Sequence, residues 1–138
     1  MFNEHGEFTV TRQGNILLVH IIGAWNVETA KAYKQTFNKT IETIKDEAWA
    51  LISNVEQWEL CTPDCEILIV QLGVESRDKG LKREAVVNTN TESVKLDLFH
   101  KHIKKDTTEI SPHVFQRCFF KTDIEANQWL KNEGYGLK

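Results

Sequence analysis

The sequence predicts an α/β protein with a mixed, mostly parallel sheet of about five strands and four helices, in the order β-β-α-β-α-β-α-β-α. Three observations lead to this prediction. An alternating segment, a glycine-containing turn and a continuously apolar run open the chain, as in a β-hairpin. Apolar strand-like runs then alternate with segments of helical periodicity. The length of 138 residues suits a single domain over residues 1–138.

The hairpin is predicted over residues 8–12 and 16–22, with Gly14 in the turn. Its second strand is apolar except for His20, so we expect it to be buried on both faces. Asn26 is a favourable N-cap for the helix that follows. Apolar residues recur there at three- and four-residue steps, which predicts a long amphipathic helix: Val27, Ala30, Tyr33, Phe37, Ile41 and Ile44.

Residues 49–55 form the next predicted strand, and the strand-helix-strand order predicts a right-handed parallel crossover. Thr62-Pro63-Asp64 then has the composition of a helix start, with an N-cap, a first-turn proline and a first-turn acid. This helix is expected over residues 63–79. The remaining predicted elements are a strand at 83–88, a helix from Thr91 or Ser93 to about Lys105, a strand at 115–120, and a helix that starts in the capping box Thr122–Glu125 and ends at Gly134.

The composition excludes several classes of function. A net charge of −3 with mixed signs offers no basic surface for nucleic acid, and the short basic stretch at 101–105 is typical of a solvated helix end. No apolar run reaches the roughly 18–20 residues of a membrane-spanning helix, and the first residues lack the pattern of a secretory signal. Three cysteines, an odd number, suit a reducing compartment, so a cytoplasmic location is expected.

The candidate reactive residues do not form a catalytic or metal-binding pattern. Cys61 and Cys65 lack zinc-site spacing, and His100 and His102 point to different sides of a helix, so we expect no metal and no cofactor. Cys65 lies in the first turn of a helix, where a thiolate is stabilised, but acidic residues flank it on both sides. The sequence therefore favours a protein that is not an enzyme.

The helix at 63–79 has two apolar sides. Cys65, Leu68, Ile69 and Leu72 gather on one side, and Ile67, Val70 and Val74 gather almost opposite. A helix on a sheet needs one such stripe, so a neighbouring helix, another subunit or a ligand must cover the second. Trp25 and Trp58 lie where predicted strands end, the edge at which open α/β sheets bind ligands; packing at the core edge is the alternative.

Four segments carry a family resemblance: Ile21-Ile22-Gly23 after the hairpin, Leu51–Val55, Glu84–Val87 and the closing Phe120–Leu130. They resemble the STAS-like proteins, in particular the bacterial SpoIIAA-like branch related to sporulation anti-sigma-factor antagonists. In the antagonists, a serine at the start of the second helix is phosphorylated by a partner kinase. The matching stretch here is Leu60–Pro63, so the resemblance implies Thr62 as the possible phospho-switch position.

The resemblance implies a non-enzymatic domain that binds proteins, nucleotides or apolar small molecules, with a fold similar to lipid-binding domains of the Sec14 type. We therefore expect a regulatory module that acts through protein–protein interaction and self-associates through the helix near residues 65–74. The alternative is a carrier or sensor of a lipid or other apolar small molecule. The residues expected at the interface or pocket are Trp25, Trp58, Ile67, Val70 and Val74.

Overall fold

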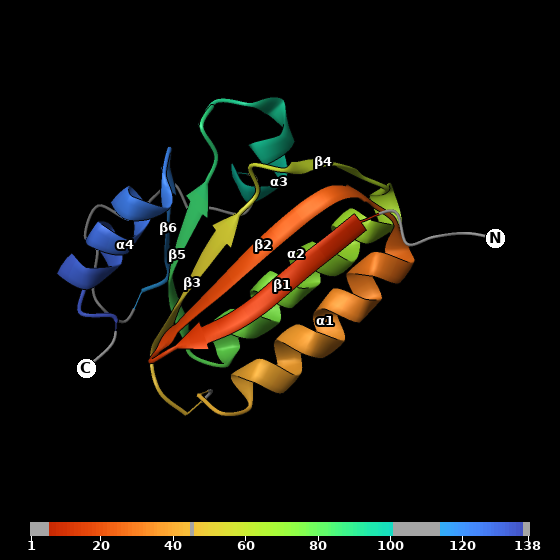
Figure 1. Cartoon of the computed structure of the whole chain (residues 1–138). Coiled ribbons are helices and arrows are strands. Elements are labelled where there is room, and N and C mark those ends of the chain that lie inside the picture. The colour runs from red at the N-terminus through yellow and green to blue at the C-terminus, as the bar shows by residue number, and fades with distance from the viewer. Residues whose placement is uncertain (1–5, 45, 101–113, 137–138) are drawn as a thin grey trace.

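The computed structural model describes residues 6–44, 46–100 and 114–136, which form one six-stranded sheet with helices on both faces (Figure 1). Strands β1 (Gly6–Gln13) and β2 (Ile16–Trp25) form the predicted antiparallel hairpin. Gly14 adopts a φ of 60° in the turn, a conformation that glycine reaches without a steric cost.

The remaining main strands are parallel to β2. They are β3 (Trp49–Asn54), β5 (Leu81–Val87) and β6 (Gln116–Phe120), in the spatial order β1-β2-β3-β5-β6. Only β1, at one edge, is antiparallel. The predicted mixed, mostly parallel sheet is therefore confirmed.

The sixth strand was not predicted. β4 (Trp58–Cys61) pairs in parallel with the far end of β2, through Gly23–Trp58 and Trp25–Cys61. β2 has 10 residues and β3 has 6, so β2 extends past its neighbour and leaves an edge that β4 occupies. A four-residue strand with one buried side chain has no detectable period, which explains why sequence reasoning read this segment as a connection.

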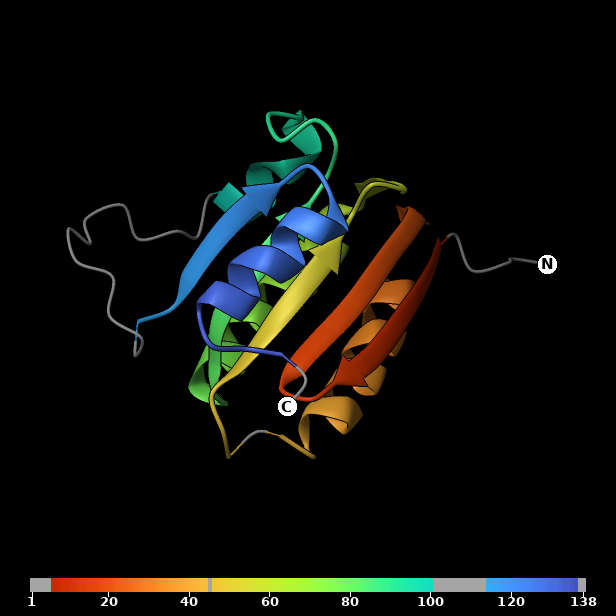
Figure 2. The same cartoon turned by 60° about the vertical axis from the view of Figure 1, so that its left-hand side comes forward.

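The helices form two layers on the sheet. α1 (Val27–Ile41) and α2 (Pro63–Asp78) lie on one face, and α4 (Asp123–Asn132) lies on the other (Figures 1 and 2). Because α4 contacts β3, β5 and β6, it leaves the second face of β2 partly open. Leu18 and His20 are accordingly only half-buried, so the prediction that β2 is buried on both faces was wrong along much of its length.

A short helical segment closes the end of the sheet. It consists of the 3-10 turn η1 (Val94–Leu96) and α3 (Asp97–His100); the rest of the helix predicted to Lys105 lies outside the described residues. The Lys95 ammonium donates to the carbonyls of Val55, Glu56 and Trp58 at 2.8, 3.1 and 2.9 Å. One cation therefore ties this segment to the turn between β3 and β4.

Two of the predicted N-caps make the expected side-chain hydrogen bonds. Asn26 Oδ1 accepts from the Thr29 amide at 3.0 Å, and Thr122 Oγ1 accepts from the Glu125 amide at 3.2 Å. Thr62 is the N-cap of α2 by backbone geometry, but its hydroxyl makes no capping bond. It donates to Asp64 Oδ1 at 2.5 Å instead, and the same oxygen accepts from the Cys65 amide at 3.0 Å.

The backbone lies in close contact with its neighbours at Gly80, between α2 and β5. Gly80 has a φ of +107°, and a Cβ there would lie 2.3 Å from the Glu47 carbonyl oxygen and 3.1 Å from the Trp49 indole. Trp49 is fully buried, and its Nε1 donates to the Lys79 carbonyl at 2.9 Å. The tryptophan is therefore held directly against the glycine.

We expect Gly80→Ala to lower the free energy of unfolding by about 2–4 kcal/mol, because it adds a steric clash to an unfavourable φ. Gly134→Ala is the matched control: Gly134 has a φ of +97°, but a Cβ there meets nothing within 4 Å. It should cost only about 1 kcal/mol. Urea unfolding of both variants measures the difference, and equal losses would show that the contact with Trp49 and Glu47 is unimportant.

Candidate functional site

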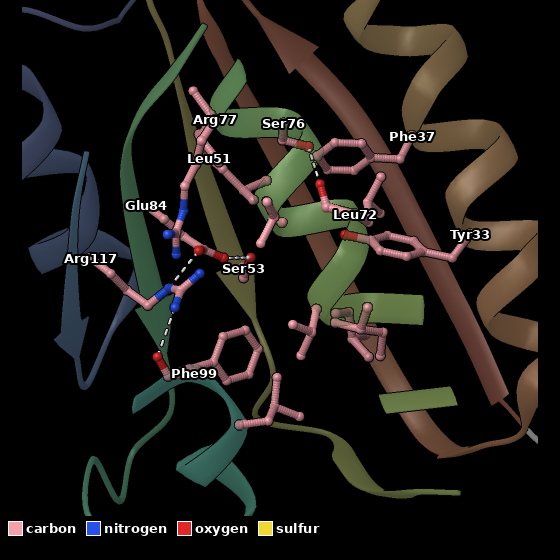
Figure 3. A pocket seen from close by; sticks show the side chains of 17 residues that line it. Tyr33, Phe37, Leu51, Ser53, Leu72, Ser76, Arg77, Glu84, Phe99 and Arg117 are labelled. Atoms are coloured by element: carbon pink, nitrogen blue, oxygen red, sulfur yellow. Dashed lines mark hydrogen bonds and ion pairs between the residues drawn. The ribbon is translucent and has the colours of Figure 1, made fainter. Parts of the chain in front are cut away.

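A pocket lies between the α1–α2 layer and the sheet (Figure 3). The cavity has a volume of about 50 Å³ and is partly open to solvent. Most of its wall is apolar, contributed by these side chains: Ile21, Phe37, Leu51, Ile69, Val70, Leu72, Val74, Leu81, Leu98 and Phe99. Apolar pockets with a few polar groups are the usual form of small-molecule sites.

One end of the pocket carries a buried ion pair. Arg117 Nε donates to Glu84 Oε1 at 2.7 Å, and both side chains are almost fully buried, with 7% and 5% exposed. Glu84 and Arg117 are direct neighbours across β5 and β6, so their side chains lie on the same face of the sheet. The Ser53 hydroxyl on β3 donates to the other carboxylate oxygen, Glu84 Oε2, at 2.8 Å.

Arg117 also connects the sheet to α3. Its Nη1 donates to the Phe99 carbonyl at 2.7 Å, and its guanidinium lies 5.6 Å from the Phe99 ring centre. A second guanidinium, that of Arg77 on α2, borders the pocket and stacks 4.1 Å from the Phe115 ring centre. Burial, followed by the nearby positive charge of Arg117, lowers the pKa of Arg77. Two guanidinium groups thus share this end of the pocket.

Tyr33, on α1, supplies a polar group away from the ion pair. It is 4% exposed, and Figure 3 shows its hydroxyl pointing from α1 toward the space between α2 and the sheet. The described residues provide this hydroxyl with no hydrogen-bond partner. Burial, followed by the charge of Glu84, raises the pKa of Tyr33, so the group is a neutral donor at physiological pH.

Of the residues predicted for an interface or pocket, two line this pocket, namely Val70 and Val74. Ile67 is 58% exposed on the outer side of α2. Trp25 is buried in an aromatic cluster, with its ring centre 5.2 Å from that of Tyr33. Trp58 packs against Phe99 at 6.2 Å, behind the pocket wall. The two tryptophans therefore support the site from behind rather than lining it.

The two cysteines at the start of α2 shift each other's pKa in opposite directions, because the hydrogen bond between their sulfurs lowers the pKa of the half-buried Cys61 and raises that of Cys65. Cys65 is fully buried. Its pKa is raised, first by its hydrogen bond with the Cys61 sulfur and then by burial, so the helix start does not activate this thiol. Thr62, the predicted phospho-switch position, is exposed, and its hydroxyl hydrogen-bonds to the Asp64 carboxylate.

Sequence reasoning missed the polar residues of the pocket. Tyr33 was assigned to the apolar face of a helix, and Glu84 and Arg117 were not singled out. A weak signal for Glu84 was present, because this carboxylate directly precedes the apolar run Ala85–Val87 of a strand. Its partners lie 31 and 33 residues away in the chain, and no local pattern connects them.

Two classes of feature are absent from the described part of the chain. Across residues 6–44, 46–100 and 114–136, no group of three or more His, Cys, Asp or Glu side chains is placed to hold a metal ion. Within the same ranges, none of the helices combines the length and apolar character required to cross a membrane.

Comparison with known proteins identifies the fold. The chain resembles the crystal structure of an uncharacterized protein of the DUF3478 family from Shewanella loihica PV-4, described as having a SpoIIAA-like fold. The two share 12% identity, with a TM-score of 0.68 over 94% of this chain and 98% of that one. This chain has the SpoIIAA-like fold. The resemblance seen in the sequence is thus confirmed at the level of the fold.

Two further comparisons gave no match: no protein-family model and no curated protein matches the chain. At 12% identity, the structural likeness carries the SpoIIAA-like architecture but no activity. The function must therefore be argued from the pocket and the surface of this SpoIIAA-like domain.

We expect Glu84→Gln to lower the free energy of unfolding by about 3–5 kcal/mol, because it leaves the buried Arg117 guanidinium without its counterion. The matched control is Glu28→Gln, which breaks a pair of 3.9 Å between side chains that are 72% and 63% exposed. That change should cost under about 0.5 kcal/mol. Chemical denaturation compares the two, and a small loss for Glu84→Gln would mean that the ion pair contributes little to stability.

Proposed function

We propose that this SpoIIAA-like domain is a non-enzymatic binding protein that holds a small, largely apolar molecule beneath α2 and acts as its carrier or sensor. The observation that carries the proposal is the pocket itself, which combines apolar walls with a buried tyrosine hydroxyl and a buried guanidinium. Keeping polar groups buried without full hydrogen bonding is costly, and a ligand that pairs with them would recover that free energy.

The chemistry of the pocket favours binding over catalysis. Its described lining includes neither histidine nor cysteine. Ser53 donates a hydrogen bond to Glu84, but the same carboxylate is held by Arg117 in an ion pair and is not free to act as a general base. A hydroxyl next to such a carboxylate is not an activated nucleophile.

The position of Val70 and Val74 supports a sensor as well as a carrier. Both line the pocket, and Val74 is also 48% exposed on the outer surface of α2. A ligand that moves these side chains would alter a surface that other proteins can contact. A protein that contacts this surface would therefore distinguish the ligand-bound domain from the ligand-free domain.

We expect native mass spectrometry of the protein, purified from its own host without added ligand, to show a fraction with mass beyond the polypeptide that is released under denaturing conditions. Leu72→Phe should lose this fraction, because Leu72 is buried in the pocket wall and a larger side chain would fill the space. Leu18→Phe, on the opposite face of the sheet, is the control and should keep it. Protein that carries only its polypeptide mass would count against the proposal.

A second candidate function, self-association in a regulatory complex, is favoured by the outer side of α2. Ile67 and Val74 are 58% and 48% exposed, and Leu60, shortly before the helix, is 72% exposed. Large aliphatic side chains grouped along one helix are candidates for burial against a partner. Lys34 and Glu75, joined at 3.7 Å, mark the flank of α2 that faces α1.

We expect sedimentation velocity at increasing concentration to show dimers. Ile67→Asp should raise the Kd of the dimer by about tenfold or more, since it replaces an aliphatic side chain that the dimer would bury with a charged one. Ile124→Asp is the matched control. Ile124 is 81% exposed on α4, on the other face of the sheet, and its substitution should leave the dimer unchanged. A protein that stays monomeric at several hundred micromolar would exclude this function, because its Kd for dimerisation would then correspond to a binding free energy of about −5 kcal/mol or weaker.

A further inference from the structure

We propose that the pocket ligand is a small carboxylic acid with an apolar, ring-sized body and a second oxygen at the opposite end. Arg117 would bind the carboxylate, and Tyr33 would donate a hydrogen bond to the distal oxygen. This inference rests on the small-molecule function proposed above and specifies the chemical class of the ligand.

The size of the pocket limits the ligand. The cavity measures about 50 Å³ and is partly open to solvent, whereas a cavity that encloses a whole benzene molecule measures roughly 150 Å³. A molecule with a single ring therefore fits only if part of it extends through the open side of the pocket. A long acyl chain does not fit unless most of it leaves the pocket.

The charged end favours an anion. Both oxygens of Glu84 are engaged, Oε1 by Arg117 and Oε2 by Ser53, so the carboxylate has limited capacity for a ligand cation. Arg117 uses Nε and Nη1 for Glu84 and the Phe99 carbonyl, and the described residues leave its Nη2 without a hydrogen bond. A buried guanidinium with spare donors is well suited to a carboxylate, and a second guanidinium borders the same end.

The tyrosine defines the second contact. Its hydroxyl belongs to α1, whereas Arg117 belongs to β6, and Figure 3 places them on different sides of the pocket. The space between them is bordered by Leu51, Leu72 and Phe99, none of which can hydrogen-bond through its side chain. A ligand that contacts both polar groups must therefore be polar at two ends and apolar between them.

The test uses 4-hydroxybenzoate as the probe, with benzoate and phenol as partial probes that each lack one polar group. Titrations are followed by amide chemical shifts of the full chain. We expect 4-hydroxybenzoate to bind most tightly and to shift resonances of α2 and β5. Tyr33→Phe should weaken the binding of 4-hydroxybenzoate by about two- to tenfold, the range expected for one hydrogen bond. It should leave the affinity for benzoate unchanged.

Two further variants complete the design. Arg117→Lys should weaken the binding of both acids by about tenfold or more, since it removes the planar guanidinium group. It should leave the affinity for phenol unchanged. Tyr135→Phe is the control tyrosine, because Tyr135 packs on the α4 side of the sheet. It should change none of the three affinities. If Arg117→Lys does not fold, the preference of the wild-type protein for benzoate over phenol measures the carboxylate contact.

The inference would be overturned if none of the three probes shifts the pocket resonances at millimolar concentration, if phenol binds as well as the acids, or if Tyr33→Phe weakens benzoate and 4-hydroxybenzoate equally. Its failure can be separated from failure of the proposed function. A protein that retains a molecule in native mass spectrometry but ignores these acids would still be a carrier or sensor, with a ligand of another class.

Discussion

The arrangement of side chains on the sheet face that borders the pocket depends on one buried carboxylate, that of Glu84. A charge in this position needs partners that also lie out of water, and the strands on either side of β5 supply them: Ser53 from β3 and Arg117 from β6. The pairing is possible only in the observed register, which sets Glu84 opposite both Leu51 and Arg117. A shift of one residue would turn these side chains to the α4 face.

The same ion pair determines how the end of the sheet is closed. Because Glu84 holds Arg117, the guanidinium is positioned to bind the Phe99 carbonyl, which fixes α3 over the pocket. Lys95 anchors the preceding turn to three carbonyls between β3 and β4. Two cations thus compensate for the short length of α3, whose 4 residues would not form a stable helix alone.

The two apolar sides of α2 contact different parts of the molecule. Its inner side packs on the core through Cys65 and Leu72, whereas Val70 and Val74 border the pocket and Ile67 faces outward. The sequence alone allowed a neighbouring helix, a second subunit or a ligand to bury the second apolar side, formed by Ile67, Val70 and Val74. α1 packs beside α2, yet the exposure of Ile67 and Val74 shows that α1 does not cover this stripe. Hence the small-molecule and self-association proposals both concern this helix.

The sequence by itself determined the order of the main strands and helices, the antiparallel hairpin, and the caps at Asn26 and Thr122, because periodicity and capping are local properties of the chain. The SpoIIAA-like fold was indicated by the resemblance of several segments to that family. Only the tertiary structure decided that residues 58–61 pair with β2, that Trp25 and Trp58 stand behind the pocket, and that Tyr33, Glu84 and Arg117 line it. These features depend on strand register and on contacts between distant segments. Local patterns do not encode which strands become neighbours, so the fold was predictable but the site was not.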